Sequence, residues 1–450
     1  MTKYEAIMRD IKRRIEERSL RPGEKLPSIR ALAKTFQCSN STVIHALQEL
    51  ETEHVIYSIP RSGHYVLNKA QPLAAEDAQG YDFAASAPNV RQFPYVHFQH
   101  CINQAINLYQ DELFVYGTPN GLPSLIRAVR AQLESYQVFA SERNIVITSG
   151  VQQALALLNA MPLPNGKTKV VVEQPGYHLF LALLKLRRTQ AIGVKRTARG
   201  IDLARLEALF QRGDVRYFYT MPRFHNPLGT SLSNADKQRI VELAERYDVY
   251  IIEDDYLADF EQDAGQMPMY YYDTNQRVIY LKSYSKIMFP GLRVGVAVLP
   301  DALVGSFQQH KLTTDIDSSM ISQAALELYI TSGMFRRHRD EVRESYIRKS
   351  RRLYASLGRY VEPFLKPGTF VHPSSVCMKA HIVLPNRIDM GALLRKLRQR
   401  HLFVGDMKEH YLESCYPEKI MKLNVSKVAE ERIESGVALI ADELSRGLHG

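Results

Sequence analysis

Apolar positions in the first seventy residues recur at helical spacing and then give way to short extended runs. Pro22-Gly23 interrupts the first helical pattern, and Pro27-Ser28 supplies a start signal for the next. The predicted elements are helices over residues 4–18, 29–36 and 41–51, and strands over residues 55–59 and 65–67. Three helices and a hairpin predict a winged helix-turn-helix over residues 1–68.

The rhythm changes after this segment. Residues 69–80 lack periodicity and are predicted to form a linker. Short apolar runs then alternate with helical stretches, which indicates a mainly parallel sheet covered by helices on both faces. We therefore predict a multi-domain α/β protein. A large domain is expected over residues 81–331, and a smaller α+β part over residues 332–450 begins with a long basic helix.

Length and composition agree with a globular protein of several domains. The chain has 450 residues, more than one core usually supports, and no apolar stretch of the roughly 20 residues that would span a bilayer. Its first residues enter an amphipathic pattern without a signal peptide. Four scattered cysteines predict no zinc site, no other metal site and no disulfides, as expected in a reducing cytoplasm. The net charge of +10 favours a polyanionic partner.

Polar side chains gather at the start of the predicted third helix and on the hairpin. In a helix-turn-helix the second helix of the motif lies in the DNA major groove, and its first residues meet base edges and phosphates. A cation on the wing reaches phosphate or the minor groove. Periodicity alone would suit a solvated helical bundle equally well. The predicted DNA-contacting residues are Arg30, Ser39, Asn40, Ser41, Thr42, His45, Arg61, Ser62, Gly63 and His64.

Three motifs carry a resemblance to a known DNA-binding family. They are Arg21-Pro-Gly-Glu-Lys-Leu-Pro-Ser-Ile-Arg30, Ser41-Thr-Val and Ser62-Gly-His-Tyr-Val. With them the segment resembles the GntR-type winged helix over nearly its whole length, which implies a double-stranded DNA operator. Relatives often carry arginine at the position of Asn40, and a small residue or threonine at that of His64. Because asparagine suits adenine and arginine suits guanine, the resemblance implies a different operator.

A second chemical pattern centres on Lys286. A strand-like run ends in Ser283-Tyr-Ser-Lys286, and Arg293 follows seven positions later. This layout suits a lysine in a Schiff base to pyridoxal 5'-phosphate (PLP), with Ser283, Ser285 and Arg293 around the phosphate. Taken alone, a lysine is far more often a surface charge than a nucleophile.

Other predicted strands end in the groups that PLP needs. Ser149-Gly150 joins a strand to a helix, whose N-terminus suits a phosphate. Further strand ends supply an aromatic ring at Tyr177, an amide at Asn226 and carboxylates at residues 253–255. Each signal is weak by itself, since a Ser-Gly or an Asp-Asp after a buried strand is commonly only a turn. Strand alternation does not decide between Asp254 and Asp255.

Together and in this order, these motifs resemble the fold-type I PLP enzymes of the aminotransferase class over residues 80–445. The resemblance implies that Lys286 forms the Schiff base and that Asp254 pairs with the pyridinium nitrogen. It implies that Asn226 and Tyr256 bond the ring oxygen and that Tyr177 stacks on the ring. The implied phosphate ligands are Val151 through its backbone, Gln152, Ser283, Ser285, Arg293 and, from the partner subunit, the residue equivalent to Tyr116.

A GntR-type winged helix fused to such a domain is similar to the MocR/GabR-type transcriptional regulators. The resemblance implies a cytoplasmic, nucleoid-associated bacterial homodimer that senses a small amine or amino acid, or the B6 vitamer itself, through aldimine formation at Lys286. The resemblance also implies RNA polymerase as a further protein partner. A working aminotransferase with an accessory DNA-binding module is the alternative. A regulator that has lost PLP is disfavoured, because Lys286, Asp254 and Arg293 are all present.

The chain departs from aminotransferases where those enzymes grip a substrate carboxylate. Lys422 stands where they typically place an arginine, and a lysine keeps the charge but loses the two-pronged hydrogen bonding. This favours a regulator over an enzyme. Arg223 either supplies the missing grip or is a surface residue, and residues 371–378 lack the paired glycines expected there. The basic helix over residues 334–357 is interrupted by acidic residues and is assigned no DNA role.

Overall fold

The computed structural model describes residues 2–53, 55–59, 62–67, 80–86, 88, 90–365 and 377–449. They form two compact units, each assembled from separate stretches of chain. The first contains Met1–Ala74, Pro94–Val115 and Met320–His338, and the second contains Ala75–Phe93, Tyr116–Ser319 and Arg339–Gly450. The linear division predicted from the sequence, with boundaries at residues 68, 80 and 331, stays a prediction. Most of its linker lies outside the described residues.

The N-terminal segment folds as three helices and a hairpin, so the predicted winged helix is confirmed. Its elements are α1 (Lys3–Glu16), α2 (Ile29–Phe36), α3 (Asn40–Thr52), β1 (Ile56–Ile59) and β2 (Gly63–Val66). The periodic apolar positions form its core, with Ile11, Val43 and Leu47 at most 1 % exposed. Helix α1 begins one residue earlier than predicted because Thr2 and Glu5 form a capping box.

Two further helices complete the first unit. These are α4 (Tyr95–Tyr109), which continues into the short 3-10 helix η2 (Gln110–Leu113), and α11 (Met320–Thr331). The hydroxyl of Tyr109 donates to Glu327 at 3.1 Å, and the rings of Phe98 and Tyr329 lie 6.0 Å apart. Long helix α12 (Met334–Tyr360) begins in this unit and continues into the second.

The second unit is built on an eight-stranded sheet with the order β4-β11-β10-β9-β8-β5-β6-β7. Strands β10, β9, β8, β5 and β6 run parallel, whereas β7 and β11 run against their neighbours. Every residue of β4, β8, β9, β10 and β11 is buried, as expected for a sheet covered on both faces. The strands are β4 (Ile145–Thr148), β5 (Lys169–Gln174), β6 (Ala191–Thr197), β7 (Gly200–Ile201), β8 (Val215–Thr220), β9 (Tyr250–Asp254), β10 (Val278–Ser283) and β11 (Gly295–Val298).

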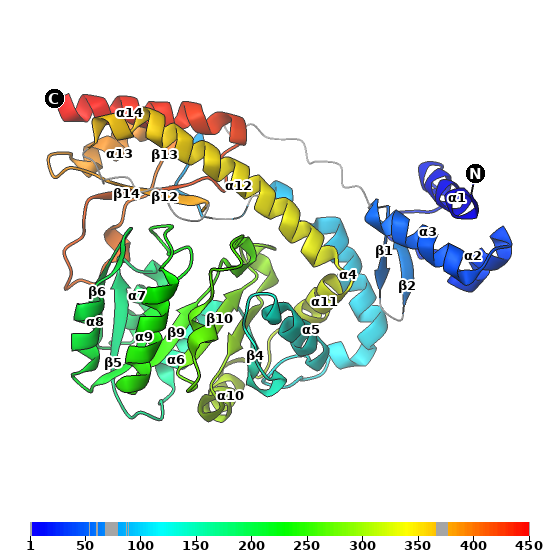
Figure 1. The fold of residues 1–450 in the computed structure, drawn as a ribbon, viewed down its shortest axis with the longest axis horizontal. Helices are drawn as coiled ribbons and strands as arrows, with labels where there is room; N and C mark the ends of the chain where they lie inside the picture. Colours follow the sequence, from blue (N-terminus) through cyan, green and yellow to red (C-terminus); the bar gives the residue numbers. More distant parts are fainter. Residues whose placement is uncertain are drawn as a thin grey trace. The chain divides into compact units, whose positions relative to one another are not determined.

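Helices that precede, connect or follow these strands in the sequence pack against the sheet (Figure 1). They are α5 (Pro123–Glu134), α6 (Val151–Ala160), α7 (His178–Leu186), α8 (Leu203–Phe210), α9 (Asn234–Arg246) and α10 (Asp301–Asp315). Apolar residues of α8 and α9, such as Leu206 and Leu243, share a core cluster with Phe218 of β8 and Ile251 of β9. The alternation predicted from the sequence is therefore confirmed as a mainly parallel α/β fold.

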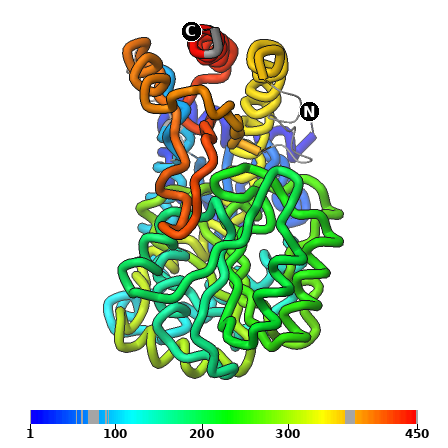
Figure 2. The backbone as a smooth tube through the Cα atoms, turned by 90° about the vertical axis from the view of Figure 1, so that its left-hand side faces the viewer, coloured from blue at the N-terminus to red at the C-terminus, as the bar shows by residue number. Residues whose placement is uncertain are grey.

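A smaller group of elements lies at one end of the large sheet (Figure 2). It contains β12 (Lys379–Val383), α13 (Met390–Gln399), β13 (Leu402–Phe403), β14 (Ile420–Asn424) and α14 (Ile433–His449), and β13 pairs with β3 (Tyr81–Asp82). Gly176, which follows β5, donates its backbone N–H to the carbonyl of His410 at 2.8 Å. The smaller group thus covers the carboxyl ends of parallel strands, where ligands bind in such sheets.

None of the helices in the described residues is long and apolar enough to cross a membrane. Within the same residues, no group of three or more His, Cys, Asp or Glu side chains is arranged to hold a metal ion.

One buried ion pair gives a direct test of the packing. Lys282 and Asp259 are at most 1 % exposed, and the Lys282 ammonium also lies 4.6 Å from the ring centre of Tyr284. Replacing the lysine by methionine leaves a buried carboxylate without its cation, so we expect Lys282→Met to lower the free energy of unfolding by about 3–5 kcal/mol in urea denaturation.

The matched control is Lys185→Met. Lys185 pairs with Glu413 in a bridge whose side chains are 72 % and 79 % exposed, and its loss should leave the urea midpoint unchanged. Equal shifts in the two variants would contradict the structure.

Candidate functional site

Lys286 lies in the turn between β10 and β11 and is partly buried. Its ammonium group donates a hydrogen bond to the carbonyl oxygen of Ser86. Burial lowers the pKa of Lys286 to about 8. Near neutral pH a larger fraction of this amine is neutral, and therefore nucleophilic, than of an exposed lysine. Position and protonation both suit a lysine that forms an imine.

Asp254 ends β9 and is 1 % exposed. Its Oδ2 accepts a hydrogen bond from the Tyr219 hydroxyl at 2.8 Å, whereas its Oδ1 is buried with no hydrogen-bond partner in the described residues. Burial raises the pKa of Asp254 to about 7. A buried carboxylate oxygen without a partner is costly unless a ligand supplies a donor. The protonated nitrogen of a pyridine ring is such a donor, so this residue fits PLP.

Asp255, the alternative carboxylate, is committed elsewhere. Its side chain is buried in an ion pair with Arg223 and accepts a hydrogen bond from the Tyr280 hydroxyl at 2.8 Å. The surface alternative for Arg223 is wrong, because the residue is only 3 % exposed. Its guanidinium binds Asp255, and its predicted contact with an effector stays a prediction. The Asp255 carboxylate raises the pKa of the Arg223 guanidinium above its ordinary value. Sequence spacing did not reveal this pairing because the partners are 32 residues apart.

The predicted phosphate site is a tight glycine turn at the start of α6. Gly150 has φ +89°, and a Cβ there would lie 2.9 Å from Arg293 Nη2. Arg293 itself donates to the carbonyl of Ser149 at 2.6 Å. A Cβ at Gly295 would lie 2.8 Å from the Gly150 backbone, so β11 also approaches too closely for a side chain. The structure thus brings Arg293 to the N-terminus of α6, which begins at Val151 and suits an anion.

The remaining predicted phosphate ligands lie on neighbouring turns. Ser283 is buried at the end of β10, and its hydroxyl accepts a hydrogen bond from the backbone N–H of Ser285 at 3.2 Å. Gln152 donates its side-chain amide to the Tyr177 hydroxyl at 2.7 Å, which ties the phosphate turn to the predicted stacking ring. Burial raises the pKa of Tyr177 to about 12, so its hydroxyl keeps its proton.

The predicted ring-oxygen ligands are only partly placed as expected. Asn226 is partly exposed in the turn after β8. The Tyr256 hydroxyl donates to the carbonyl of Phe224 at 2.8 Å and accepts from Lys379 Nζ at 2.8 Å. Its only proton is therefore used within the chain, and a bond to a ring oxygen would require the hydroxyl to turn. Tyr116, which was predicted to serve the partner subunit, is 81 % exposed.

Lys422, the predicted effector contact, is held by a buried histidine. Lys422 Nζ lies 2.9 Å from Nε2 of His410, and Nδ1 of His410 lies 2.7 Å from the carbonyl oxygen of Gly176. Because a carbonyl only accepts, Nδ1 carries the proton and Nε2 accepts from the lysine. Burial and the lysine lower the pKa of His410 to about 3, which keeps the ring neutral. The His410 ring therefore positions the Lys422 ammonium group.

His410 and four further residues shape this site without having been predicted from the sequence. Ser86 and Lys379 contact Lys286 and Tyr256 respectively, and Tyr219 bonds Asp254. Asp315, at the end of α10, accepts from the Ser149 hydroxyl at 3.1 Å and from the Gln153 amide at 2.6 Å, and so supports the phosphate turn. Of these residues, only Lys379 left a sequence signal, because residues 379–382 alternate polar and apolar side chains.

The predicted DNA face is mostly exposed. Arg30, Asn40, Ser41 and His45 all lie on the surface of α2 and α3. Ser39 is instead the N-cap of α3: its hydroxyl accepts the backbone N–H of Thr42 at 3.2 Å and lies 2.9 Å from the Thr42 hydroxyl. Besides their predicted place on the DNA face, the two residues therefore order the start of α3.

The wing differs more from expectation. The Ser62 hydroxyl is hydrogen-bonded to the Tyr65 hydroxyl at 2.6 Å. His64 is partly buried, with its Nε2 3.8 Å from the Glu51 carboxylate, and burial lowers the pKa of His64. Gly63 has φ +114° at the turn of the hairpin, and the side chain of Lys25 lies beside it. Lys25 is thus an exposed cation near the wing that the sequence analysis omitted. Arg61 lies outside the described residues.

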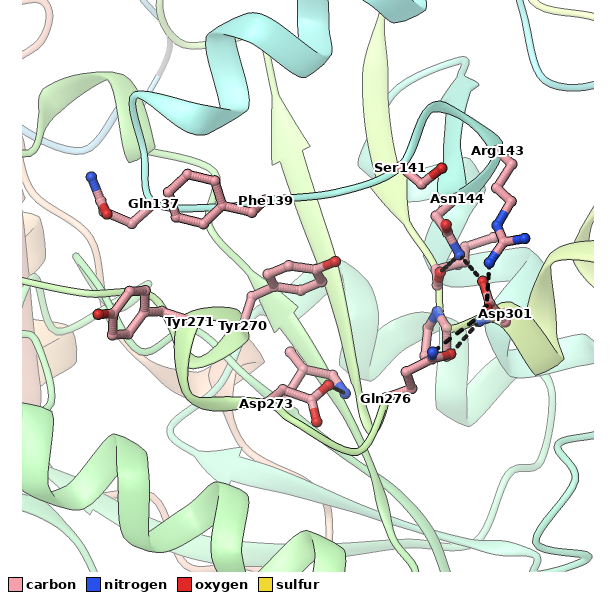
Figure 3. A pocket seen from close by; sticks show the side chains of 13 residues that line it. Gln137, Phe139, Ser141, Arg143, Asn144, Tyr270, Tyr271, Asp273, Gln276 and Asp301 are labelled. Atoms are coloured by element: carbon pink, nitrogen blue, oxygen red, sulfur yellow. Dashed lines mark hydrogen bonds and ion pairs between the residues drawn. The ribbon is translucent and has the colours of Figure 1, made fainter.

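A cavity of about 350 Å³ elsewhere in the second unit contains none of these residues. It is lined by Phe139, Tyr270 and Tyr271, and by Asn144 and Asp301, which are joined by a 2.6 Å hydrogen bond (Figure 3). Val278 also lines the cavity. Asn144 directly precedes β4, and Val278 is the first residue of β10. The cavity therefore lies at the opposite end of these strands from Ser149 and Ser283.

Two family comparisons together cover most of the chain. Residues 3–66 match the bacterial regulatory proteins of the gntR family, and residues 89–440 match aminotransferase class I and II. The chain belongs to the MocR type of regulator. In this family type a GntR helix-turn-helix is fused to an aminotransferase domain, and class I and II aminotransferases are PLP-dependent.

This MocR-type chain is similar to a transcriptional regulator over its whole length and to solved aminotransferases over its second part. It is 50 % identical to the uncharacterized HTH-type transcriptional regulator YcxD of Bacillus subtilis over 99 % of this chain and 100 % of the relative. Among solved structures, a kynurenine aminotransferase from Pyrococcus horikoshii in complex with PMP has a TM-score of 0.74 at 26 % identity, covering 82 % of this chain and 92 % of that one. A multiple substrate aminotransferase from Thermococcus profundus has a TM-score of 0.75 at 24 % identity, with coverage of 83 % and 93 %.

The lowered pKa of Lys286 predicts when this lysine reacts with PLP. Only the neutral amine attacks the aldehyde, so the rate of imine formation should rise as pH rises and level off above about pH 8. An exposed lysine would show its midpoint near pH 10.4. We expect the visible absorption that follows mixing of protein and PLP to report this rate. Lys286→Ala is the control and should give no imine; a wild-type midpoint near pH 10.4 would contradict the burial.

Proposed function

We propose that the protein is a PLP-dependent transcriptional regulator that binds DNA through its winged helix and senses a small amine through Lys286. The observation that carries this proposal is that two groups suited to PLP occur in one site. Lys286 is a partly buried amine with a lowered pKa, and Asp254 has a buried oxygen without a hydrogen-bond partner in the described residues. A GntR-type DNA-binding domain lies in the same chain.

Each part of PLP would have its own residues in this site. Lys286 would bind the aldehyde carbon, Asp254 would hold the ring nitrogen, and Tyr177 and Asn226 would border the ring. The N-terminus of α6, together with Arg293, Ser283, Ser285 and Gln152, would hold the phosphate. When bound, PLP would supply an electrophilic carbon for which amines compete. Lys286 without that bond has the Ser86 carbonyl as its hydrogen-bond partner, as in this structure.

The predicted effector contact at Lys422 suits a regulator better than an enzyme. Lys422 offers a point charge held by neutral His410, without the two parallel hydrogen bonds with which arginine orients a carboxylate. A loosely oriented ligand suits binding more than repeated turnover. An active aminotransferase with an accessory DNA-binding module is the second candidate, favoured by the likeness to the Pyrococcus horikoshii and Thermococcus profundus enzymes.

A homodimer is part of the proposal. In the first unit Leu108, Phe114 and Val115 are 54 %, 67 % and 62 % exposed, although they are apolar. Contiguous exposed apolar side chains commonly mark an interaction surface. We propose that a second copy of the chain covers them and that Tyr116 then reaches the partner's phosphate. Two winged helices in one dimer would read two half-sites of an operator.

Sensing requires only that the effector bind one conformation better than another. A nearly complete switch takes about 5.5 kcal/mol of differential affinity, whereas no turnover is needed. The same linkage makes the operator change the affinity for the effector by the same factor. We propose that the protein acts in this way on DNA in a bacterial cytoplasm.

A DNA-binding measurement tests the regulatory half. A duplex selected from a random pool should bind the full-length protein with an affinity that falls steeply with salt, because phosphate contacts release counterions. Arg30→Ala should weaken binding and lower the salt slope by about one unit.

Two comparison variants sharpen this experiment. Arg199→Ala changes an exposed arginine in the second unit and should bind DNA as wild type does. Lys286→Ala should also bind DNA while losing the visible absorption of bound PLP. If Arg30→Ala bound DNA with unchanged affinity and salt slope, the DNA face would be misplaced; a wild type that selects no duplex would refute the proposed function.

A further inference from the structure

The two-stranded ribbon of β12 and β14 carries polar side chains on one face. The strands are antiparallel, with Lys379 opposite Asn424 and His381 opposite Lys422. Because side chains alternate along a strand, these four share a face. The other face bears Ala380, Ile382, Met421 and Leu423, all buried apolar residues. Lysine and histidine on the inner face of a ribbon are unusual, since that face normally packs apolar side chains.

The polar face lies against the cofactor site. Asn424 donates to the Ser86 hydroxyl at 3.3 Å, and the carbonyl of the same serine accepts from Lys286. His381 Nδ1 lies 2.8 Å from the carbonyl oxygen of Leu228, in the turn that contains Asn226. A Cβ at Gly229 in that turn would come within 2.6 Å of the Lys379 carbonyl, so the ribbon and the turn are in direct contact.

This face carries more positive charge than the chain compensates. Lys379 and Lys422 are diagonal neighbours in the register, a separation of about 7–8 Å between backbone positions. In the described part of the chain, neither makes an ion pair with a carboxylate: Lys379 contacts the Tyr256 hydroxyl, and Lys422 contacts the His410 ring. Lys379 is only 4 % exposed. A buried ammonium with a neutral partner is costly, so such a group is rarely retained without an anion to bind.

Acidic groups lie near these lysines without touching them. Asp254 favours the charged form of Lys379, and Asp406 and Glu409 favour that of Lys422. Burial and the neighbouring Lys286 outweigh Asp254 and lower the pKa of Lys379 to about 7. An anionic ligand would reverse this balance, because it supplies the missing counter-charge inside the site.

The two ammonium groups are directed to different places. Lys379 reaches Tyr256, which follows β9, whereas Lys422 reaches His410, which is bonded to Gly176 after β5. Strands β9 and β5 are separated by β8, so their ends lie roughly 10 Å apart at the usual strand spacing. One carboxylate does not span that distance. Two separate acidic groups on one ligand would.

We infer that Lys379 is a second anion-binding residue of the effector site and that the effector is an amine with two acidic groups, such as a dicarboxylic amino acid. This inference rests on the proposed function. Lys422 receives one carboxylate, Lys379 receives the other, and the amine takes the place of Lys286. A neutral amino acid still engages Lys422 but leaves Lys379 buried without an anion. Ligand discrimination therefore resides in Lys379.

Matched pairs of amino acids test the inference. The PLP-loaded full-length protein is titrated with L-glutamate and L-glutamine, and with L-aspartate and L-asparagine, while visible absorption and calorimetry report binding. Within each pair the ligands differ only in an acid against an amide. We expect at least one acid to bind tenfold or more tightly than its amide. Lys379→Met should abolish that preference and leave amide binding within about threefold.

Three control measurements separate the possible roles of Lys379. Lys379→Arg keeps the charge and should keep the acid preference, which also guards against a fold lost in the methionine variant. Lys408→Met removes an exposed lysine two positions from His410 and should bind all ligands as wild type does. The dissociation constant for PLP is measured in wild type and Lys379→Met, so that each protein is titrated with PLP at saturation.

Each contrary result has its own meaning. If the wild type bound acids and amides equally, or if Lys379→Met weakened both alike, the inference would be overturned while the amine sensor stood. A loss of PLP affinity in Lys379→Met would instead assign the lysine to the cofactor and also overturn it. A PLP-loaded wild type that responds to no amino acid or other amine refutes the proposed function itself.

Discussion

The organisation of this protein depends on an imbalance of buried charge at the carboxyl ends of the parallel strands. Three amines, those of Lys286, Lys379 and Lys422, lie in this region. Asp254, the carboxylate that favours the charged form of Lys379, is itself buried with one oxygen unpartnered in the described residues. The low polarity of the surroundings lowers the pKa of Lys286 and Lys379 and raises that of Asp254. A polypeptide that simply maximised its stability would replace these groups by apolar ones. Their presence indicates ligands that complete the charge balance.

That imbalance also bears on the choice between regulator and enzyme. Aminotransferases orient a substrate carboxylate with a bidentate guanidinium, whereas this chain presents Lys422 on a neutral imidazole. The Arg223 guanidinium is paired with Asp255. The remaining cations are lysines, which attract acidic groups as point charges without the two parallel hydrogen bonds of a guanidinium. Such a site can shift a population between two conformations, which is all that a sensor needs.

Prediction from sequence is most specific where the chemistry is local. The Lys286 segment places the lysine, two serines and Arg293 within eleven residues, and the helical periodicity of the winged helix identifies its core directly. Prediction failed where long-range pairing decides the outcome. Arg223 is buried by a carboxylate from another strand end, and Lys379 acquires its neighbours only through the register of β12 with β14. His64 similarly owes its partial burial to Glu51 on α3.

Simultaneous measurement of DNA affinity and keto-acid release tests the central claim most directly. The PLP-loaded protein is incubated with a selected duplex and an acidic amino acid, while fluorescence anisotropy follows DNA binding and an assay follows the keto acid. The account predicts a changed DNA affinity, at most one equivalent of keto acid per site, and no response in Lys286→Ala. Sustained keto-acid release with unchanged DNA affinity would contradict it and identify a working aminotransferase.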